Sequence, residues 1–169
     1  MILEVPAVNL RPVPADPVAL RDAYACFPSG VAALCALDGG QPAGIAASSF
    51  TPVSIDPPLV SVCVQKTSTT WPRLRHMLRL GVSVLADDQD EICRALAGKG
   101  DRFRQVEWRE TGQGTVLVNG AAAWFDCSIY RELEAGDHLL VLLEVHAMLA
   151  DRQRQPLVFH HSKLRRLGG

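Results

Sequence analysis

The sequence predicts a mainly β domain, a β-barrel with a few short helices at its periphery. Short apolar runs typical of strands recur along the chain, and turn signals such as Asp38-Gly39-Gly40 and Gly136-Asp137 separate neighbouring runs. The regular alternation of strands and helices that builds a doubly wound sheet is absent. With 169 residues, the chain is long enough for one domain core and leaves little room for two.

Composition and charge narrow the possible partners. Hydrophobic residues make up 48% and charged residues 21% of the chain, as in ordinary globular proteins. The net charge of −1 gives no electrostatic argument for a nucleic-acid partner. No apolar run reaches the ~20 residues that span a bilayer, and the proline-broken N-terminal segment carries Glu4 before any basic residue, unlike a secretory signal. We therefore expect a cytoplasmic protein without nucleic-acid or membrane partners.

The N-terminal third is predicted to hold an arm, a helix and three strands. Prolines at positions 6, 12 and 14 exclude a helix interior, so residues 1–15 are expected to form an extended arm before a single domain at 16–169. Asp16-Pro17 is typical of a helix start, and "PVALRDAYACF" is expected to be helical until Pro28-Ser29-Gly30. The three predicted strands are "VAALCALDGG" (31–40), "PAGIAASSF" (42–50) and "LVSVCVQK" (59–66).

The remaining chain is predicted to form a helix, a strand, a second helix and then four consecutive strands. A helix is expected in "WPRLRHML" (71–78), capped by a hydroxyl of residues 68–70, and another in "DEICRALAG" (90–98), which ends at a glycine. A strand, "LGVSVLA" (80–86), separates them. The last four strands are "TVLVNG", "AAAWFDCSIYREL", "DHLLVLLEVHAML" and "PLVFHH", of which the middle two form a long antiparallel pair.

Several familiar chemistries are excluded. The five cysteines are odd in number and form no CxxC pair, so we expect reduced, buried thiols rather than disulfides or a zinc ribbon. His160 and His161 would point to opposite faces of a strand and have no nearby third ligand, so no metal site is predicted. The glycines of "GQGTVLVNG" and "GKGDRF" match neither a Rossmann fingerprint nor a P-loop, and the GxSxG elbow of hydrolases is missing.

Two polar segments between apolar runs point to a flat, phosphate-bearing ligand. In "AGIAASSFTPVSIDPPLV" (43–60), short side chains leave the backbone open to a ring, and Asp56-Pro57-Pro58 is typical of a rigid turn. In "VCVQKTSTTWPRLR" (62–75), Lys66 and four consecutive hydroxyl residues precede a helix start, which favours an anion. Simple helix capping explains the second segment equally well. Together the two segments match the needs of a flavin: an apolar slot, backbone partners and a phosphate site.

At this point the sequence resembles the short-chain flavin reductases, the reductase components of two-component flavin-dependent monooxygenases. Four segments carry the resemblance, in the family's order and over roughly residues 18–167: "FPSGV" (27–31), "ASSFTPVSIDPPLVSVCVQKTSTTWPRLR" (47–75), "LAGKGDRF" (96–103) and "AGDHLLVLLEV" (135–145). The resemblance implies a split β-barrel of the Greek-key, FMN-binding type that binds FMN or FAD at a homodimer interface. It also implies hydride transfer from NADH or NADPH to flavin, and supply of reduced flavin to a transient monooxygenase partner.

The resemblance also implies roles for individual residues. His138 is the expected catalytic residue, near the docking site of the nicotinamide; a strand-start histidine bonded to a backbone carbonyl is the alternative. Ala47, Ser48, Ser49, Phe50 and Thr51 are expected to line the flavin ring, and Pro28 and Ser29 either touch it or simply end the helix. The other expected cofactor-binding residues are Cys63, Val64, Gln65, Lys66, Ser68, Thr70, Lys99, Arg102, Phe103 and His160.

Two positions depart from the family pattern, and two other functions remain open. An asparagine often stands where this chain has Ser83, and an aromatic residue is usual near Leu164, so cofactor affinity or donor preference is expected to differ. The alternatives are a flavin-binding or storage protein without turnover, and a split-barrel oxidase of the pyridoxamine-phosphate type or a deazaflavin-dependent reductase. The loop at 98–103 and His138 favour the reductase, because storage needs no nicotinamide site.

Overall fold

The computed structural model describes residues 8–167, which form three short helices and twelve strands. The helices are α1 (Pro17–Tyr24), α2 (Trp71–Leu74) and α3 (Asp90–Ala97). The strands are β1 (Ser29–Gly30), β2 (Ala32–Asp38), β3 (Gln41–Ala47), β4 (Thr51–Ile55), β5 (Pro58–Gln65), β6 (Leu80–Val84), β7 (Trp108–Glu110), β8 (Val116–Val118), β9 (Ala123–Ala135), β10 (His138–Ala150), β11 (Val158–His160) and β12 (Lys163–Arg165). The predicted mainly β fold with a few short helices is confirmed.

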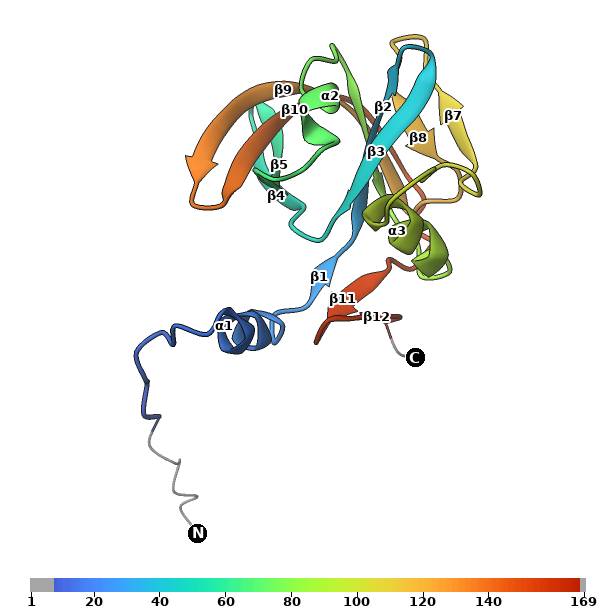
Figure 1. Cartoon of the computed structure of the whole chain (residues 1–169). Coiled ribbons are helices and arrows are strands. Elements are labelled where there is room, and N and C mark those ends of the chain that lie inside the picture. The colour runs from blue at the N-terminus through green and yellow to red at the C-terminus, as the bar shows by residue number, and fades with distance from the viewer. Residues whose placement is uncertain (1–7, 168–169) are drawn as a thin grey trace.

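A curved seven-stranded sheet dominates the molecule. Its strands follow the order β3-β2-β6-β9-β10-β5-β4, and each neighbouring pair is antiparallel. The long β9–β10 hairpin bends strongly, while β1, β11 and β12 form a small separate sheet below it (Figure 1). The pairing of β5 with β10 places Gln65 opposite His138, which brings segments far apart in sequence to one end of the sheet.

The core lies on both faces of β2, because this strand is apolar at every position from Ala32 to Ala36. Leu34 packs on one face in a cluster with Leu74 of α2 and Val141 of β10. Ala33 and Cys35 pack on the other face, against residues of α3, β8 and the segment before β11. α2 and α3 therefore each cover a different part of the sheet, and both lie close to β3.

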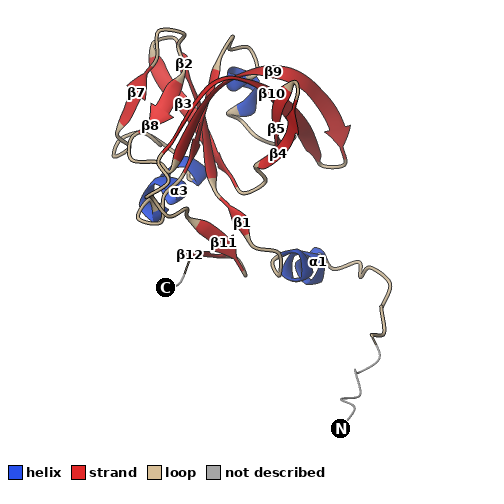
Figure 2. Cartoon of the chain, turned by 180° about the vertical axis from the view of Figure 1, so that it is seen from behind, coloured by secondary structure: helices blue, strands red, loops and turns tan. Residues whose placement is uncertain are grey.

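Helix α1 stands apart from this core (Figure 2). The predicted start is confirmed: the Asp16 carboxylate accepts a hydrogen bond from the backbone N–H of Val18 at 2.9 Å, and Pro17 occupies the first turn. No residue of α1 is buried, and Tyr24 and the following Phe27 are 68% and 77% exposed. Of the predicted arm, residues 1–7 lie outside the described residues, and residues 8–15 form no helix or strand.

The structure adds four strands that the sequence patterns did not predict: β1, β4, β7 and β12. Each is two to five residues long, so alternation has too few positions to show. β4 also contains Pro52, which is tolerated because this strand lies at the edge of the sheet. The predicted Asp56-Pro57-Pro58 turn is confirmed as the connection between β4 and β5.

Two other predictions were wrong in part. The helix expected at 71–78 is a single turn, Trp71–Leu74, since the chain then turns towards β6. The expectation of five buried thiols fails for Cys26 and Cys63, which are exposed, whereas Cys35 and Cys127 are buried and Cys93 is intermediate. Among the described residues, no helix is long and apolar enough to cross a membrane.

Candidate functional site

The loop between β3 and β4 is held against the end of β5 by one side chain. The Ser49 hydroxyl accepts a hydrogen bond from the Cys63 backbone N–H at 2.8 Å and donates one to the Cys63 carbonyl at 3.1 Å. The N–H and the C=O of Cys63 are thus both hydrogen-bonded to Ser49, as they would be to the backbone of a neighbouring strand. The loop is thereby fixed, and the small side chains of Ala47 and Ser48 stand beside β5.

One hollow of about 640 Å³ lies between this loop, β5 and the end of α3; we call it the α3 hollow. Its walls come from β3, β5, the hydroxyl-rich segment that follows β5, and the α3 terminus with Gly98 and Lys99. No carboxylate side chain is among its described lining residues, whereas Lys99 and Arg102 bring positive charge. This volume lies within the ~300–1,000 Å³ range of small-molecule sites.

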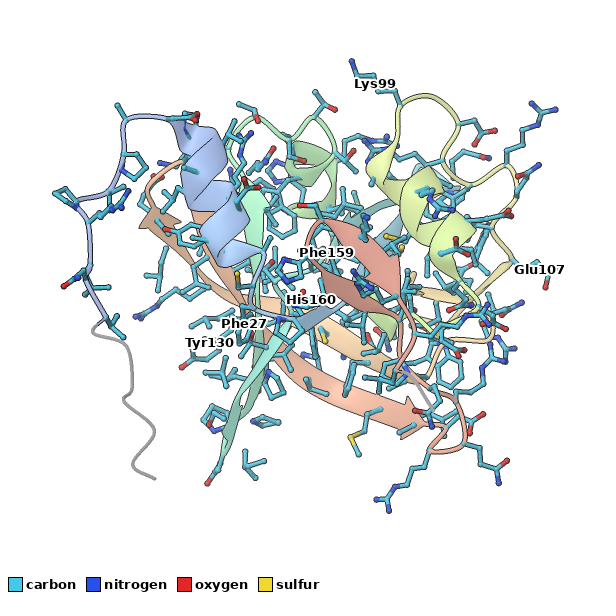
Figure 3. The ribbon with its side chains drawn as sticks, turned by 90° about the horizontal axis from the view of Figure 1, so that it is seen from below. Phe27, Lys99, Glu107, Tyr130, Phe159 and His160 are labelled. Atoms are coloured by element: carbon cyan, nitrogen blue, oxygen red, sulfur yellow. The ribbon has the colours of Figure 1, made fainter. Side chains whose placement is uncertain are left out.

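A second hollow of about 930 Å³ lies on the other side of the same loop, under α1; we call it the α1 hollow. Tyr24, Phe27 and Phe159 give it an aromatic wall, with Phe27 in the segment that follows α1 and Phe159 in β11 (Figure 3). Ser48, Ser49, Gln65 and His138 line both hollows. The two hollows therefore meet at these four residues.

His138 stands at this meeting point with its ring held by its neighbour. Its Nδ1 lies 2.8 Å from a carboxylate oxygen of Asp137, and its side chain is 33% exposed. The hydrogen bond from His138 and the positive charge of His138 lower the pKa of the Asp137 carboxyl. Because Nδ1 is committed to Asp137, Nε2 is the ring nitrogen left for a ligand. The contact is with a carboxylate, not with the backbone carbonyl of the alternative interpretation.

The glycine-rich loop after α3 is tied to the site by Arg102. Its guanidinium donates hydrogen bonds to the carbonyls of Gly98 and Gly44 and to the Thr70 hydroxyl, at 2.8, 2.9 and 2.8 Å. The neighbouring Phe103 packs so closely on Gly44 that a Cβ there would lie 3.0 Å from its ring. Arg102 and Phe103 thus hold the loop in place beneath the α3 hollow.

The residues expected to bind phosphate separate in the structure. Lys66 forms an ion pair with Glu134 of β9 and lines a different hollow, on the far side of the hydroxyl-rich segment. The Ser68 hydroxyl accepts a hydrogen bond from the Trp71 backbone N–H at 3.1 Å, the capping contact that the sequence left open. Lys99 forms no side-chain ion pair with another described residue and lies at the outer end of the loop after α3 (Figure 3).

The structure brings most of the predicted site together. The α3 hollow is lined by Ala47, Ser48, Ser49, Cys63, Val64, Gln65, Ser68, Lys99, Arg102 and His138. Phe50 and Thr51 line the α1 hollow, whereas Thr70 and Phe103 line a smaller cavity with Arg102. His160 lies on β11 beside Phe159 but is not among the described residues that line either large hollow.

Several lining residues of the α1 hollow were not predicted as site residues, namely Arg21, Tyr24, Phe27 and Phe159. The motif "FPSGV" pointed to this region only through Pro28 and Ser29, which do line the hollow. Ser83, one of the two positions that depart from the family pattern, is fully buried, and its hydroxyl accepts a hydrogen bond from the Val118 N–H at 3.0 Å. Leu164 packs against the core cluster on the α3 side of the sheet.

Comparison with known proteins gives this geometry a family context. Residues 24–168 match the model of the flavin reductase like domain. The chain is 35% identical over 147 residues to a flavin reductase of Pseudomonas putida, with 86% of each chain covered. It is 40% identical over 134 residues to a probable flavin reductase of Rhizobium meliloti, covering 78% of this chain but only 43% of that protein.

Solved structures are similar over nearly the whole chain. The NADH:FAD oxidoreductase SgcE6 of Streptomyces globisporus superposes with a TM-score of 0.87 at 35% identity, covering 97% of this chain and all of that one. The same protein in complex with NAD and FAD fragments gives a TM-score of 0.88. BorF, the flavin reductase component of a bacterial two-component tryptophan halogenase, gives 0.82 at 32% identity. The resemblance identified from the four sequence segments is confirmed.

Proposed function

Because the chain belongs to the family of flavin reductase-like domains, we propose that it is an NAD(P)H:flavin oxidoreductase. It transfers a hydride from NADH or NADPH to FMN or FAD and supplies the reduced flavin to a flavin-dependent monooxygenase. The observation that carries the proposal is the meeting of the α1 and α3 hollows at Ser48, Ser49, Gln65 and His138. Two ligands, one in each hollow, would have their reactive ends side by side at this wall.

The α3 hollow fits a flavin. Ala47 and Ser48 leave the backbone open to a flat ring, and the absence of carboxylates among the described lining residues suits a phosphate. Lys99 is the cation available to that phosphate, because Lys66 is paired with Glu134 and Arg102 is engaged by three acceptors. Ser49 contributes by fixing the loop, since its hydroxyl is already bonded to Cys63.

Bound flavin supplies the redox chemistry, as the acceptor of the hydride that the nicotinamide gives up. The protein's own residues position the reactants and exclude water. His138 lines both hollows and its Nδ1 is held by Asp137, which leaves Nε2 to hydrogen-bond the polar edge of a ligand at the meeting wall. The proposed role of His138, the catalytic residue implied by the family resemblance, is to orient the hydride donor.

The proposal also includes a monooxygenase partner, a homodimer and a cytoplasmic location. Relatives named as reductase subunits of flavin-dependent monooxygenases, such as HsaB of Rhodococcus jostii at 32% identity, support a monooxygenase partner. A homodimer and a cytoplasmic location, both expected from the sequence, remain part of this proposal. The exposed apolar residues of the β9–β10 pair, Tyr130, Met148 and Leu149, support a second copy as the dimer partner.

Steady-state kinetics test the proposed function. The wild-type protein should oxidise NADH or NADPH at a rate that saturates with added FMN, FAD or riboflavin, with no second substrate. His138→Ala should lower kcat/KM for the nicotinamide by about 10- to 100-fold, as expected when an orienting hydrogen bond is lost. His146→Ala is the matched control, because this histidine lies on β10 away from both hollows and bonds Ser128.

The same experiment separates the alternatives. A protein that retains flavin through purification but shows no flavin-dependent NAD(P)H oxidation would be a storage module. Oxidation of a small amine by bound FMN, with oxygen as acceptor and no need for NAD(P)H, would indicate the oxidase type. Either result would rule out the proposed reductase.

A further inference from the structure

We propose that α1 binds the adenosine diphosphate half of the hydride donor, with the Arg21 guanidinium pairing with its pyrophosphate. This inference rests on the proposed function, since it takes the nicotinamide to lie at His138. It assigns a specificity role to an element that the core does not use: α1 buries none of its residues yet forms one wall of the larger hollow.

Charge is the first argument. Arg21 is the one permanently charged residue among the described lining residues of the α1 hollow, and no carboxylate lines it. Its side chain makes no ion pair or hydrogen bond with another described residue. A guanidinium offers several N–H donors in a fixed plane, which suits the oxygens of a pyrophosphate.

Asp137, the carboxyl whose pKa is affected by Arg21, does not form an ion pair with this cation. Asp137 bonds His138 through its carboxylate and is 94% exposed, outside the hollow's lining. Arg21 lies close enough to lower the pKa of Asp137, although the hydrogen bond and charge of His138 contribute more. Arg21 is therefore within electrostatic range of the end of the site where the nicotinamide is proposed to lie, and it remains free to bind an anion.

Aromatic surface is the second argument. Tyr24 and Phe27 are 68% and 77% exposed and both line the α1 hollow, so their rings are accessible to a ligand that enters it. Tyr24 follows Arg21 by three positions, so both side chains lie on one face of α1. A nucleobase stacks favourably on such rings. The α1 hollow therefore offers a partner for each part of this half of the donor, a guanidinium for the pyrophosphate and aromatic rings for the adenine.

The arrangement of the two hollows is the third argument. Each hollow has a cation that does not line the other: Lys99 in the α3 hollow and Arg21 in the α1 hollow. The shared wall between them carries no permanent charge. Two ligands that each join a ring to a phosphate tail would place their rings together at this wall and their tails apart.

Donors of graded length test the role of Arg21. The kinetic parameters of wild type and Arg21→Gln are measured with NADH and with reduced nicotinamide riboside, which lacks phosphate. Arg21→Gln should raise KM for NADH by about tenfold, the loss of one charge-assisted contact, and leave KM and kcat for the riboside unchanged. Arg152→Gln is the control, since this exposed arginine lies in the turn after β10 and lines neither hollow.

Binding without turnover gives an independent measurement. ADP-ribose, which carries the pyrophosphate and adenosine but no nicotinamide, is titrated into the protein by calorimetry. We expect Arg21→Gln and Tyr24→Leu each to weaken its binding by about fivefold or more, and added salt to weaken binding to wild type more than to Arg21→Gln.

The outcomes distinguish this inference from the proposed function. If wild type oxidises NADH with flavin but Arg21→Gln behaves like wild type towards NADH and ADP-ribose, the role of α1 is wrong and the reductase stands. An equal loss with reduced nicotinamide riboside would also overturn it, because Arg21 would then act through the hairpin at Asp137. If wild type fails to oxidise NADH with any flavin, it is the proposed function that fails.

Discussion

At the scale of single residues, the contact between His138 and Asp137 links the site to pH. The hydrogen bond and positive charge of His138 lower the pKa of the Asp137 carboxyl in the folded protein. A carboxyl with a lowered folded-state pKa stabilises the fold above its unfolded pKa, and this contribution is lost as pH falls through the folded value. The contribution of Asp137 to the free energy of unfolding is therefore lost only at acidic pH.

His138→Ala should return the pKa of Asp137 towards its ordinary value, because both the donor and its charge are removed. Carboxyl titration by ¹³C NMR measures this shift directly in the two proteins. In His146→Ala, which removes a histidine bonded only to Ser128, the Asp137 titration should match wild type. An unchanged Asp137 pKa in His138→Ala would show that the contact is absent in solution.

Cys63 reports on ligand binding because its exposed side chain lies in the α3 hollow. With FAD present at ten times its dissociation constant, alkylation of Cys63 should slow by about tenfold, in proportion to the unoccupied fraction. Cys26, also exposed but outside both hollows, is the internal control. Burial raises the pKa of Cys35 and Cys127 to about 12, so neither should react. Peptide mass spectrometry after timed labelling resolves each site, and equal protection of Cys26 would argue against a local effect.

Residue-level prediction succeeded where a local signal existed. The two polar segments, 43–60 and 62–75, and the Gly136-Asp137-His138 turn stand out in the sequence, and Ser48, Ser49, Gln65 and His138 from them line both hollows. Lys66 shows the limit: its charge was visible, but its ion pair with Glu134 depends on the pairing of three strands. Arg21 and Phe159 reach the α1 hollow from opposite ends of the chain, so no local pattern could connect them.

At the scale of elements, Arg102 makes the loop after α3 part of the site. Its three hydrogen bonds join the end of α3, strand β3 and the start of α2, which lie in three separate parts of the sequence. Gly44 allows the close approach, since a Cβ there would lie 2.6 Å from the sulfur of Cys35 and 3.0 Å from Phe103. The hydrogen bonds of Arg102 and the absence of a side chain at Gly44 together set the position of the loop.

Arg102→Gln should destabilise the protein by about 1–3 kcal/mol, because acceptors that are partly buried lose their donor. The stronger expectation is local: amide hydrogen exchange in residues 98–103 should quicken, and KM for flavin should rise more than KM for NADH. Arg104→Gln removes an exposed arginine from the same loop and should leave exchange and KM close to wild type. Equal exchange rates in both variants would mean that Arg102 does not anchor the loop.

Element prediction was accurate for long strands and poor for short ones. β9 and β10, of 13 residues each, showed their length and their turn in the sequence. β1 and β12 have two and three residues, and their pairing with β11 is set by tertiary contacts rather than by alternation. The pairing of β1 with β11 sets Ser29 opposite Phe159, and both line the α1 hollow, so a missed strand helps to position one of the residues that was not predicted.

At the scale of the whole molecule, the fold class could be predicted from the sequence patterns, but the strand order could not. The central placement of β9 between β6 and β10 joins strands separated by some forty residues of chain, and only the assembled core selects it. The same limit applies to the dimer surface. The apolar pattern of 121–129 and 139–145 suits a dimer surface and a core equally well, and the structure places Cys127, Val141 and Leu143 in the core. Exposed apolar side chains remain farther along the same strands, at Tyr130, Met148 and Leu149.

If a second copy covers these side chains, the protein should be a dimer whose thermal midpoint rises with protein concentration, because association stabilises only the folded state. Light scattering after gel filtration measures the mass, and Tyr130→Asp combined with Leu149→Asp should shift it towards the monomer. Val13→Asp, a change at a 72% exposed position in the N-terminal segment, should leave the dimer intact. A wild-type protein that runs as a monomer while binding flavin fully would contradict the dimer. The α1 and α3 hollows of a single chain would then be enough to form the site.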